Sequence, residues 1–220
     1  MAETGPSPTT TREAVLDAAR TMLGSGLVEG TAGNVSGRLP GGLVCLTPSS
    51  VAYDTMTLDD LVVVELDGTV VEGHRSPTTE RDLHLAVLRR HPELGAVIHT
   101  HAVHATMFAL AHEPIPAVIE EVVVYVGGDV PCCGYRGTGT ADLGVEVAAH
   151  LHDRGAALLA NHGLVTCGAT PGKALHIAAL VERTAQIVWG ARAMGATIHP
   201  LPERVNADMA GVYRYLRQNP

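Results

Sequence analysis

The sequence has few aromatic residues, few basic residues and no long hydrophobic run. Phe, Trp and Tyr make up 3% of the 220 residues, so the core must be built from Ala, Val, Leu and Ile. The formal net charge is −8 and no basic segment stands out, which argues against a nucleic-acid partner or an anionic membrane surface. No segment reaches the roughly 18 apolar residues that a membrane-spanning helix needs. A globular fold is expected, because hydrophobic residues still make up 46%.

Signals for secretion and for disulfide bonds are also missing. The first residues lack the charged start and apolar middle of a signal peptide, and we expect residues 1–10 to form a disordered lead. The spacing of the four cysteines matches neither a zinc ribbon nor a redox pair. We therefore expect small buried cysteine side chains in a reducing cytoplasm.

Helix and strand signals alternate along the chain and predict one α/β domain over residues 1–220. Apolar spacing predicts helices over 11–25, 76–94, 102–112, 140–155 and 170–195. Short apolar runs predict a strand pair around 43–46, a hairpin around 62–72, a buried strand over 95–101 and two strands that meet near 161–163. β-branched residues dominate 117–128, and the tail 213–220 is short and polar and can pack on a neighbour. The combination predicts a central mixed, largely antiparallel sheet covered by helices on both sides.

Three histidines lie within the stretch GAVIHTHAVH. His99 and His101 are two residues apart at the end of a buried strand, so their side chains point to the same side and can share a metal ion. The alternative is a pair of core histidines bonded to backbone, because a chain with 12 histidines produces some such pairs by chance. His104 lies where the chain turns into a helix, and we interpret it either as a helix-start residue or as a residue that supports the metal ligands without binding the metal itself.

A third ligand is needed, since catalytic zinc takes three protein ligands and keeps one position open. His162 lies at a similar polar break, in NHGLVTCG, where a tight turn can present its imidazole; it can equally be an ordinary turn histidine. The remaining histidines lie on predicted polar faces or loops. We expect their side chains to be exposed: His74, His84, His91, His112, His150, His152, His176 and His199.

Glu80 lies at the start of the helix that precedes the histidine strand. Beside a divalent metal, such a carboxylate can be a fourth ligand or a general base. Without a metal it is a first-turn glutamate that the helix dipole stabilises. Three nearby segments offer hydroxyls, amides and backbone N–H groups, which form either an anion site or ordinary turns. The candidate residues are Gly33, Asn34, Ser49, Ser50, Thr78 and Thr79.

Five motifs together resemble a known family. GTAGNVSGR, LTPSS, SPTTE, VIHTHAVH and NHGLVTCG occur in the order seen in the class II aldolase and adducin-type family, and most resemble its fuculose-1-phosphate aldolase branch. The resemblance extends over roughly residues 11–195. It implies a zinc ion held by His99, His101 and His162, with Mn²⁺ or Co²⁺ as alternatives. It also implies Glu80 as the acid/base beside the metal and a substrate phosphate among the six candidate residues.

The activity implied by the resemblance is a cytoplasmic zinc-dependent aldolase of carbohydrate metabolism. Such an enzyme reversibly cleaves a ketose 1-phosphate, L-fuculose 1-phosphate or a related deoxyketose 1-phosphate, to dihydroxyacetone phosphate and an aldehyde. Zinc would stabilise the charge of the enediolate, and Glu80 would transfer the proton at the reacting carbon. The resemblance further implies a C4 homotetramer with active sites at subunit interfaces. No Schiff-base lysine is required, and the chain has few lysines.

One position departs from the family pattern. Glu120 stands where fuculose-1-phosphate aldolases carry a tyrosine proton donor, and Glu121 follows it. Tyr213 and Tyr215 resemble the C-terminal tyrosine that reaches the active site in the aldolases. A carboxylic acid donates a proton only where burial or a nearby charge keeps it protonated. A methylthioribulose-1-phosphate type dehydratase, a pentulose-phosphate 4-epimerase and a sugar-acid phosphate decarboxylase of the same fold therefore stay open.

Two other protein classes fit the sequence less well. A non-catalytic domain of this fold, as in the adducin head, would lack the metal histidines that this chain keeps. A cupin-like metal enzyme also has two histidines two residues apart, but it is all-β and carries a glutamate soon after the pair. Here AVHATMF and long helices follow instead.

Overall fold

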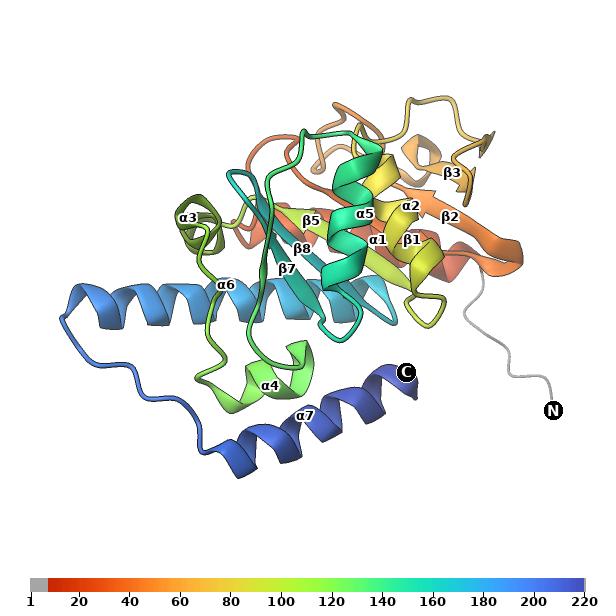
Figure 1. Ribbon diagram of the computed structural model, residues 1–220. Coiled ribbons are helices and arrows are strands. Elements are labelled where there is room, and N and C mark those ends of the chain that lie inside the picture. The colour runs from red at the N-terminus through yellow and green to blue at the C-terminus, as the bar shows by residue number, and fades with distance from the viewer. Residues whose placement is uncertain (1–7, 220) are drawn as a thin grey trace.

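Eight strands form one sheet in the computed structural model, which describes residues 8–219 (Figure 1). Their order across the sheet is β4-β3-β2-β1-β5-β8-β7-β6, and every neighbouring pair is antiparallel except β6 with β7. This confirms the prediction of a mixed, largely antiparallel sheet. The strands are β1 (Asn34–Arg38), β2 (Leu43–Leu46), β3 (Val62–Glu65), β4 (Val70–Glu72), β5 (Ala96–Thr100), β6 (Cys132–Cys133), β7 (Ala156–Leu159) and β8 (Gly163–Gly168).

Helices cover both faces of the sheet, as expected. One hydrophobic core lies between the sheet and the helices α1, α3, α4 and α6, and the other lies between the sheet and the pair α2 and α5. Two short 3-10 helices lie in the connections at Pro40–Gly42 and Leu58–Asp60. The α-helices are α1 (Pro8–Gly24), α2 (Arg81–Arg90), α3 (Val103–Ala111), α4 (Glu120–Val126), α5 (Ala141–His150), α6 (Pro171–Ala193) and α7 (Glu203–Gln218).

Alternation along β5 decides to which face of the sheet His99 points. Ala96 and Ile98 belong to the core on the α1 and α6 side, whereas Val97 belongs to the core on the α2 and α5 side. Because successive side chains of a strand point to opposite faces, His99 shares the face of Val97. It therefore lies on the side of the sheet that α2 covers.

Three segments fold differently from their sequence signals. Helix α1 begins at Pro8, so part of the expected lead is helical, while residues 1–7 lie outside the described residues. The β-branched run 117–128 contains helix α4, because Val122, Val123 and Val126 bury one face at helical spacing. The tail is no separate polar piece, since it belongs to α7, which packs on α4 of the same chain.

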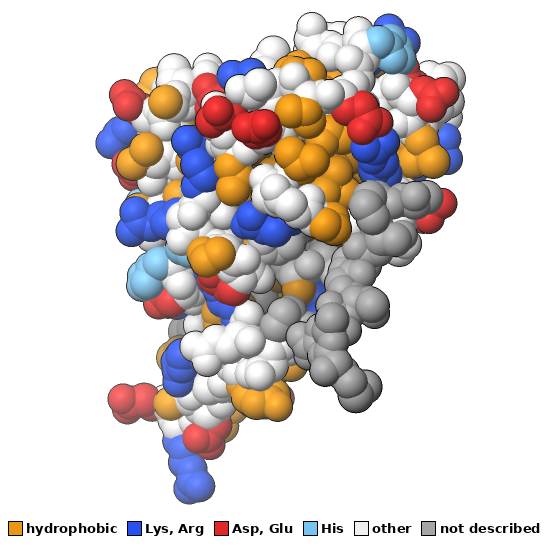
Figure 2. All heavy atoms as spheres, turned by 90° about the vertical axis from the view of Figure 1, so that its right-hand side faces the viewer, with side chains coloured by type: hydrophobic (Ala, Val, Ile, Leu, Met, Phe, Trp, Pro, Cys, Tyr) orange, Lys and Arg blue, Asp and Glu red, His pale blue; other side chains and the backbone are white. Residues whose placement is uncertain are grey.

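The cap of α6, the cysteines and the outer surface complete the description of the fold. The Thr170 side chain accepts a hydrogen bond from the Lys173 N–H and caps α6. The four cysteines are free; Cys132 is half-buried and the other three are buried. Within residues 8–219, no helix has the length and apolar character that crossing a membrane requires. On the face that Figure 2 shows, basic side chains alternate with acidic ones and form no continuous basic patch among the described residues.

Candidate metal centre

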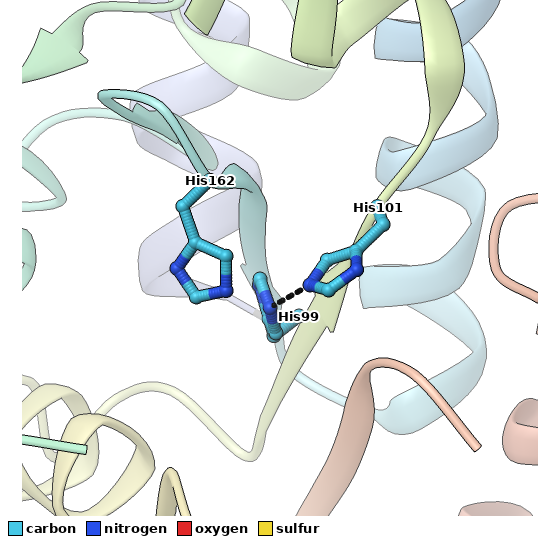
Figure 3. A group of neighbouring side chains, drawn as sticks. All are labelled: His99, His101 and His162. Atoms are coloured by element: carbon cyan, nitrogen blue, oxygen red, sulfur yellow. Dashed lines mark hydrogen bonds between the residues drawn. The ribbon is translucent and has the colours of Figure 1, made fainter. Parts of the chain in front are cut away.

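Three imidazoles lie together at one end of β5 and β8 (Figure 3). His99 is on β5, His101 follows that strand, and His162 lies in the turn between β7 and β8. Antiparallel pairing of β5 with β8 places this turn beside the end of β5. One ring nitrogen from each histidine lies within 4.8 Å of the others, and the ring centroids are 4.6 to 5.1 Å apart. The tertiary structure thus brings together the three histidines that the sequence singled out.

The hydrogen bonding of His99 prepares it to bind a metal. Its Nδ1 lies 3.0 Å from the Leu164 carbonyl oxygen, which can only accept, so Nδ1 carries the proton. The lone pair of Nε2 then faces the cluster, with Nε2 of His101 at 3.0 Å. Burial, followed by the neighbouring imidazoles, lowers the pKa of His99 well below its usual value, and burial also lowers the pKa of His101. Both rings are therefore neutral, which is the form that binds metals.

Glu80 adds a carboxylate to the three imidazoles. It is the N-cap of α2, as expected for a helix start, and is 4% exposed. Its Oε2 accepts a hydrogen bond of 3.0 Å from Nδ2 of Asn34 and lies 3.2 Å from Nε2 of His99. Its Oε1 lies 3.7 Å from Nε2 of His162 and is buried without a hydrogen-bond partner among the described residues.

This donor set fits a divalent metal ion. A buried carboxylate oxygen without a partner is costly, and a cation between it and the imidazoles would satisfy it. A tetrahedral zinc ion with bonds of about 2.0–2.1 Å separates its ligand nitrogens by about 3.3 Å. The spread of up to 4.8 Å among the histidine nitrogens is close enough for small side-chain rotations to reach that geometry.

The two hydroxyl-rich segments predicted as part of an anion site lie side by side. Pro48 and Pro77 form an antiparallel bridge, and the Ser49 N–H donates to the carbonyl of Ser76 at 2.9 Å. Ser50 and Thr79 are exposed and Ser49 is half-buried. The segments 46–50 and 76–80 therefore offer three hydroxyls open to a ligand, next to Glu80.

The other three predicted anion-site residues are occupied by hydrogen bonds or close packing within the chain. Both ends of the buried Asn34 amide are hydrogen-bonded, one to Glu80 and the other to His84. The Thr78 hydroxyl accepts from the Glu80 N–H at 3.3 Å. Gly33 has a φ of 74°, and a Cβ there would lie 2.6 Å from the His99 carbonyl oxygen. These residues form the wall around Glu80 and His99.

The predicted proton donors lie away from the histidines of their own chain. Glu120 is exposed at the first residue of α4. Tyr213 is 6% exposed; its hydroxyl accepts from Arg217 at 2.8 Å, and its ring lies against Gly127. Burial raises the pKa of Tyr213. Tyr215, by contrast, is 65% exposed. Within the described chain the fold does not bring these residues to the metal centre.

Two histidines expected on the surface are buried, so that interpretation was wrong for His84 and His91. His84 is 0% exposed, and its ring nitrogens lie 2.7 Å from the Ser36 hydroxyl and 2.5 Å from Oδ1 of Asn34. His91 is 6% exposed, and its Nε2 donates to the carbonyl of Ala148. One signal was available for His84: it follows Glu80 by four residues and so lies on the same face of α2.

His104 is a helix-start residue, as predicted. It is the second residue of α3, and its Nδ1 lies 2.7 Å from Oε1 of Glu182 on α6. The Glu182 carboxylate also accepts from the backbone N–H groups of His104 and Ala105, so it caps α3 from a distant part of the chain. This contact fixes the helix that directly follows the strand of His99.

Comparison with known proteins decides the family. The family model described as Class II Aldolase and Adducin N-terminal domain matches residues 13–189. The chain belongs to the class II aldolase and adducin family. Membership confirms the resemblance inferred from the five motifs, and with it the prediction of an enzyme of class II aldolase type.

Relatives within the class II aldolase and adducin family carry different activities in their names. L-Ribulose-5-phosphate 4-epimerase of Salmonella typhi is 37% identical over 205 residues, which cover 87% of this chain and 90% of that protein. L-Fuculose phosphate aldolase of Escherichia coli is 38% identical over 173 residues, covering 79% and 80%. 5-Deoxy-D-ribulose 1-phosphate aldolase of Bacillus thuringiensis is 35% identical over 185 residues, covering 84% and 86%. Identity alone does not separate aldolase from epimerase.

Solved structures agree on the class II aldolase fold. A structure of L-fuculose 1-phosphate aldolase superposes with a TM-score of 0.89 at 30% identity, covering 95% of this chain and 98% of that one. A second structure, of YgbL from Klebsiella pneumoniae, described as a putative aldolase/epimerase/decarboxylase, superposes with a TM-score of 0.86 at 27% identity, covering 93% and 100%. The predicted class II aldolase architecture is confirmed.

Proposed function

We propose that this member of the class II aldolase family is a metal-dependent aldolase acting on a ketose 1-phosphate. It would reversibly cleave L-fuculose 1-phosphate, or a related deoxyketose 1-phosphate, to dihydroxyacetone phosphate and an aldehyde. The observation that carries this proposal is the buried Oε1 of Glu80, which has no hydrogen-bond partner among the described residues and lies 3.7 Å from Nε2 of His162, one of the three clustered imidazoles. Open hydroxyls on two adjacent loops supply a place for the phosphate.

Each group of residues has a distinct task in this reaction. His99, His101 and His162 would hold the metal, with zinc the first candidate and Mn²⁺ or Co²⁺ the alternatives. When bound, the ion polarises the substrate carbonyl and stabilises the negative charge left when the carbon–carbon bond breaks. Glu80 would return a proton to that carbon during cleavage and remove it in the reverse direction.

The phosphate group would bind where the segments 46–50 and 76–80 meet. Ser49, Ser50 and Thr79 present hydroxyls to solvent there, whereas the side chains of Asn34 and Thr78 are already hydrogen-bonded to protein groups. Hydroxyls and backbone N–H groups bind phosphate without requiring a basic side chain. This division assigns Gly33, Asn34 and Thr78 to shaping the site.

The aldehyde side of the reaction needs a second acid/base group, which takes the proton of the C4 hydroxyl during cleavage and donates it to the aldehyde oxygen in the reverse direction. We propose that this group comes from a neighbouring subunit of a homotetramer. Glu120 is exposed at the start of α4 and is the leading candidate, with Tyr215 exposed on α7 as the other. Tyr213 is the weaker candidate, because its hydroxyl is buried against Arg217.

A pentulose-phosphate 4-epimerase is the second candidate function. Aldol cleavage and 4-epimerisation of a 2-ketose both break the bond between C3 and C4, and an epimerase re-forms this bond on the other face of the aldehyde. The phosphate distinguishes the substrates, since it lies on C1 in the aldolase substrates and on C5 in L-ribulose 5-phosphate. The specific observation in favour of the epimerase is the carboxylate of Glu120 in place of a tyrosine, together with 37% identity to an epimerase.

Product analysis separates the two functions. The zinc-loaded protein would be incubated with L-fuculose 1-phosphate, 5-deoxy-D-ribulose 1-phosphate and L-ribulose 5-phosphate, with a His162→Ala variant as the control. Release of dihydroxyacetone phosphate from either 1-phosphate, followed by coupled NADH oxidation, is the expected result. Formation of the C4 epimer from L-ribulose 5-phosphate, with no cleavage of the 1-phosphates, would replace the aldolase by the epimerase. No reaction with any of the three would contradict both.

A further inference from the structure

A row of four polar side chains runs from the metal centre into the interior. Glu80 and His84 lie one helical turn apart at the start of α2, and Asn34 and Ser36 are two residues apart on β1, so each pair lies on one face of its element. The two pairs interdigitate in the order Glu80, Asn34, His84, Ser36, joined by contacts of 3.0, 2.5 and 2.7 Å. At most 4% of any of these residues is exposed.

The direction of each hydrogen bond in this row follows from the chemistry of the groups. Nδ2 of Asn34 donates to the Glu80 carboxylate, so the other end of the amide, Oδ1, must accept. His84 Nε2 must therefore carry the proton that it donates to Oδ1. Burial lowers the pKa of His84 to about 3, so the ring is neutral and Nδ1 accepts from the Ser36 hydroxyl at 2.7 Å; the Val97 carbonyl, at 3.4 Å from the same hydroxyl, is the more distant acceptor.

We propose that His84 is a positioning residue for Glu80 and acts through the Asn34 amide. A side-chain amide can rotate by half a turn, so that its oxygen and nitrogen change places. In the rotated state Oδ1 of Asn34 would face the Glu80 carboxylate, with no hydrogen between the two oxygens. The Nε2–H of His84 pairs only with Oδ1 and so selects the orientation in which Nδ2 holds Oε2 of Glu80. Glu80 Oε1 is then left without a hydrogen-bond partner among the described residues and faces Nε2 of His162 at 3.7 Å.

This inference rests on the proposed acid/base role of Glu80 and extends it. The hydrogen bonds of His84 go to Ser36 and Asn34 and not to the three metal-site histidines. Its loss should therefore leave these histidines in place. What changes is the freedom of the Asn34 amide and, with it, the position of the carboxylate. A misplaced acid/base group lowers kcat, the rate at which the bound substrate reacts, more than it lowers the affinity for the substrate.

The test compares His84→Leu and His84→Gln with His91→Leu as a matched control. His91 is the other buried histidine of the α2 region, at its C-cap; its Nε2 donates to the carbonyl of Ala148 and its Nδ1 lies 3.7 Å from Oε1 of Glu93. For His84→Leu we expect kcat to fall about 10- to 100-fold, with KM within about threefold and zinc content unchanged. The His84→Gln side chain amide can donate to Asn34, so it should recover most of the lost kcat. His91→Leu should lower the melting temperature but keep kcat.

Two results would overturn the proposal: a kcat of His84→Leu no lower than that of His91→Leu, or a rise in KM at unchanged kcat. A second measurement does not depend on a folded variant or on a known substrate. Long-range ¹H–¹⁵N spectra of the zinc-loaded wild-type protein should show His84 neutral and protonated at Nε2. Protonation at Nδ1 instead would contradict the derived chain of donors, whatever reaction the enzyme performs. If no tested sugar phosphate reacts, the proposed function fails. The spectrum still decides the direction of the hydrogen bonds that link Ser36, His84, Asn34 and Glu80.

Discussion

At the scale of single residues, the three metal-site histidines are not equivalent. His99 is buried and held by the Leu164 carbonyl, His162 is half-buried in its turn, and His101 is exposed. The fixed His99 defines where the ion must lie, and the other two imidazoles close on it from the solvent side. A graded arrangement of this kind lets a metal ion enter while one ligand stays oriented by the protein.

Removal of the ligand most distant in sequence tests the metal centre directly. We expect His162→Ala to lose the zinc that the wild-type protein holds at about one ion per chain after dialysis, because two imidazoles bind zinc far more weakly than three. Metal content measured by plasma emission spectrometry checks this. His152→Ala, at a side chain 66% exposed, serves as the control and should keep its zinc. Equal zinc in both variants would rule out the three-histidine site.

The free energy of unfolding should decrease in acid because His84 is buried in its neutral form. Its pKa is about 3 in the folded protein and roughly 6.5 in an unfolded chain. Below about pH 6.5 the unfolded state therefore binds a proton that the folded state does not. The free energy of unfolding of the metal-free protein should fall by up to about 1.4 kcal/mol for each pH unit from this residue alone.

Urea unfolding of wild type and His84→Gln between about pH 7 and pH 4 isolates this contribution. Other titrating groups act equally in both proteins, so the difference between the two pH slopes belongs to His84. The variant should show the shallower slope. Parallel slopes would show that His84 gains a proton in the folded protein as readily as in the unfolded chain.

At the scale of elements, close packing of the turn between β7 and β8 against β5 sets the distance between the histidines. A Cβ on Gly163 would lie 2.4 Å from the Thr100 carbonyl oxygen and 3.3 Å from Cε1 of His99. Backbone at that distance cannot accommodate a methyl group without moving the strand. The glycine next to His162 is thus required for the approach of the two strands and not for an unusual turn conformation.

Substitution of this glycine should weaken metal binding without changing any ligand. We expect Gly163→Ala to shift His162 away from His99 and lower the affinity for Co²⁺ by about tenfold or more, with some loss of stability. Titration with Co²⁺ followed by its visible absorption measures the effect. Gly190→Ala on α6, where a Cβ meets nothing within 4 Å, is the matched control and should bind Co²⁺ normally. Normal Co²⁺ affinity in Gly163→Ala would contradict the packing account.

At the scale of the whole molecule, the proposed site is divided: the three histidines and the open hydroxyls lie next to Glu80, but Glu120 lies on the other side of the sheet from His99. Glu120 lies exposed on α4, which packs with α7 on the core away from the α2 face that His99 shares. A shared site between subunits would explain why a chemically suited carboxylate faces solvent.

Mixing two inactive variants tests whether subunits share the site. Glu120→Ala and His162→Ala should each have little activity, and a refolded equal mixture should recover about one quarter of wild-type activity. The fraction follows because a site needs an intact metal centre from one chain and an intact Glu120 from its neighbour. Activity of the mixture no greater than the mean of the two separate variants would place Glu120 outside a shared site. Each variant refolded alone is the control.

Much of the site was predictable from sequence, because its chemistry is encoded locally. His99 and His101 follow a buried strand, His162 interrupts an apolar run, and Glu80 begins a helix. Strand alternation and helix periodicity are short-range rules, so they also predicted the sheet and most helices. These rules did not predict helix α4 in the β-branched run, because burial of its valines at helical spacing outweighed their preference for strands.

Sequence alone determined which side chains can bind a metal and which segments carry them. Only the tertiary structure decided which side chains meet, because contacts between β1, α2 and β5 depend on strand register and helix placement across many residues. Burial, in turn, decided their protonation: His84, which sequence placed on the surface, is enclosed and kept neutral beside Asn34. The same enclosure placed Tyr213 against Arg217 and left Glu120 in solvent, since a residue's surroundings are set by the whole fold and not by its neighbours in the chain.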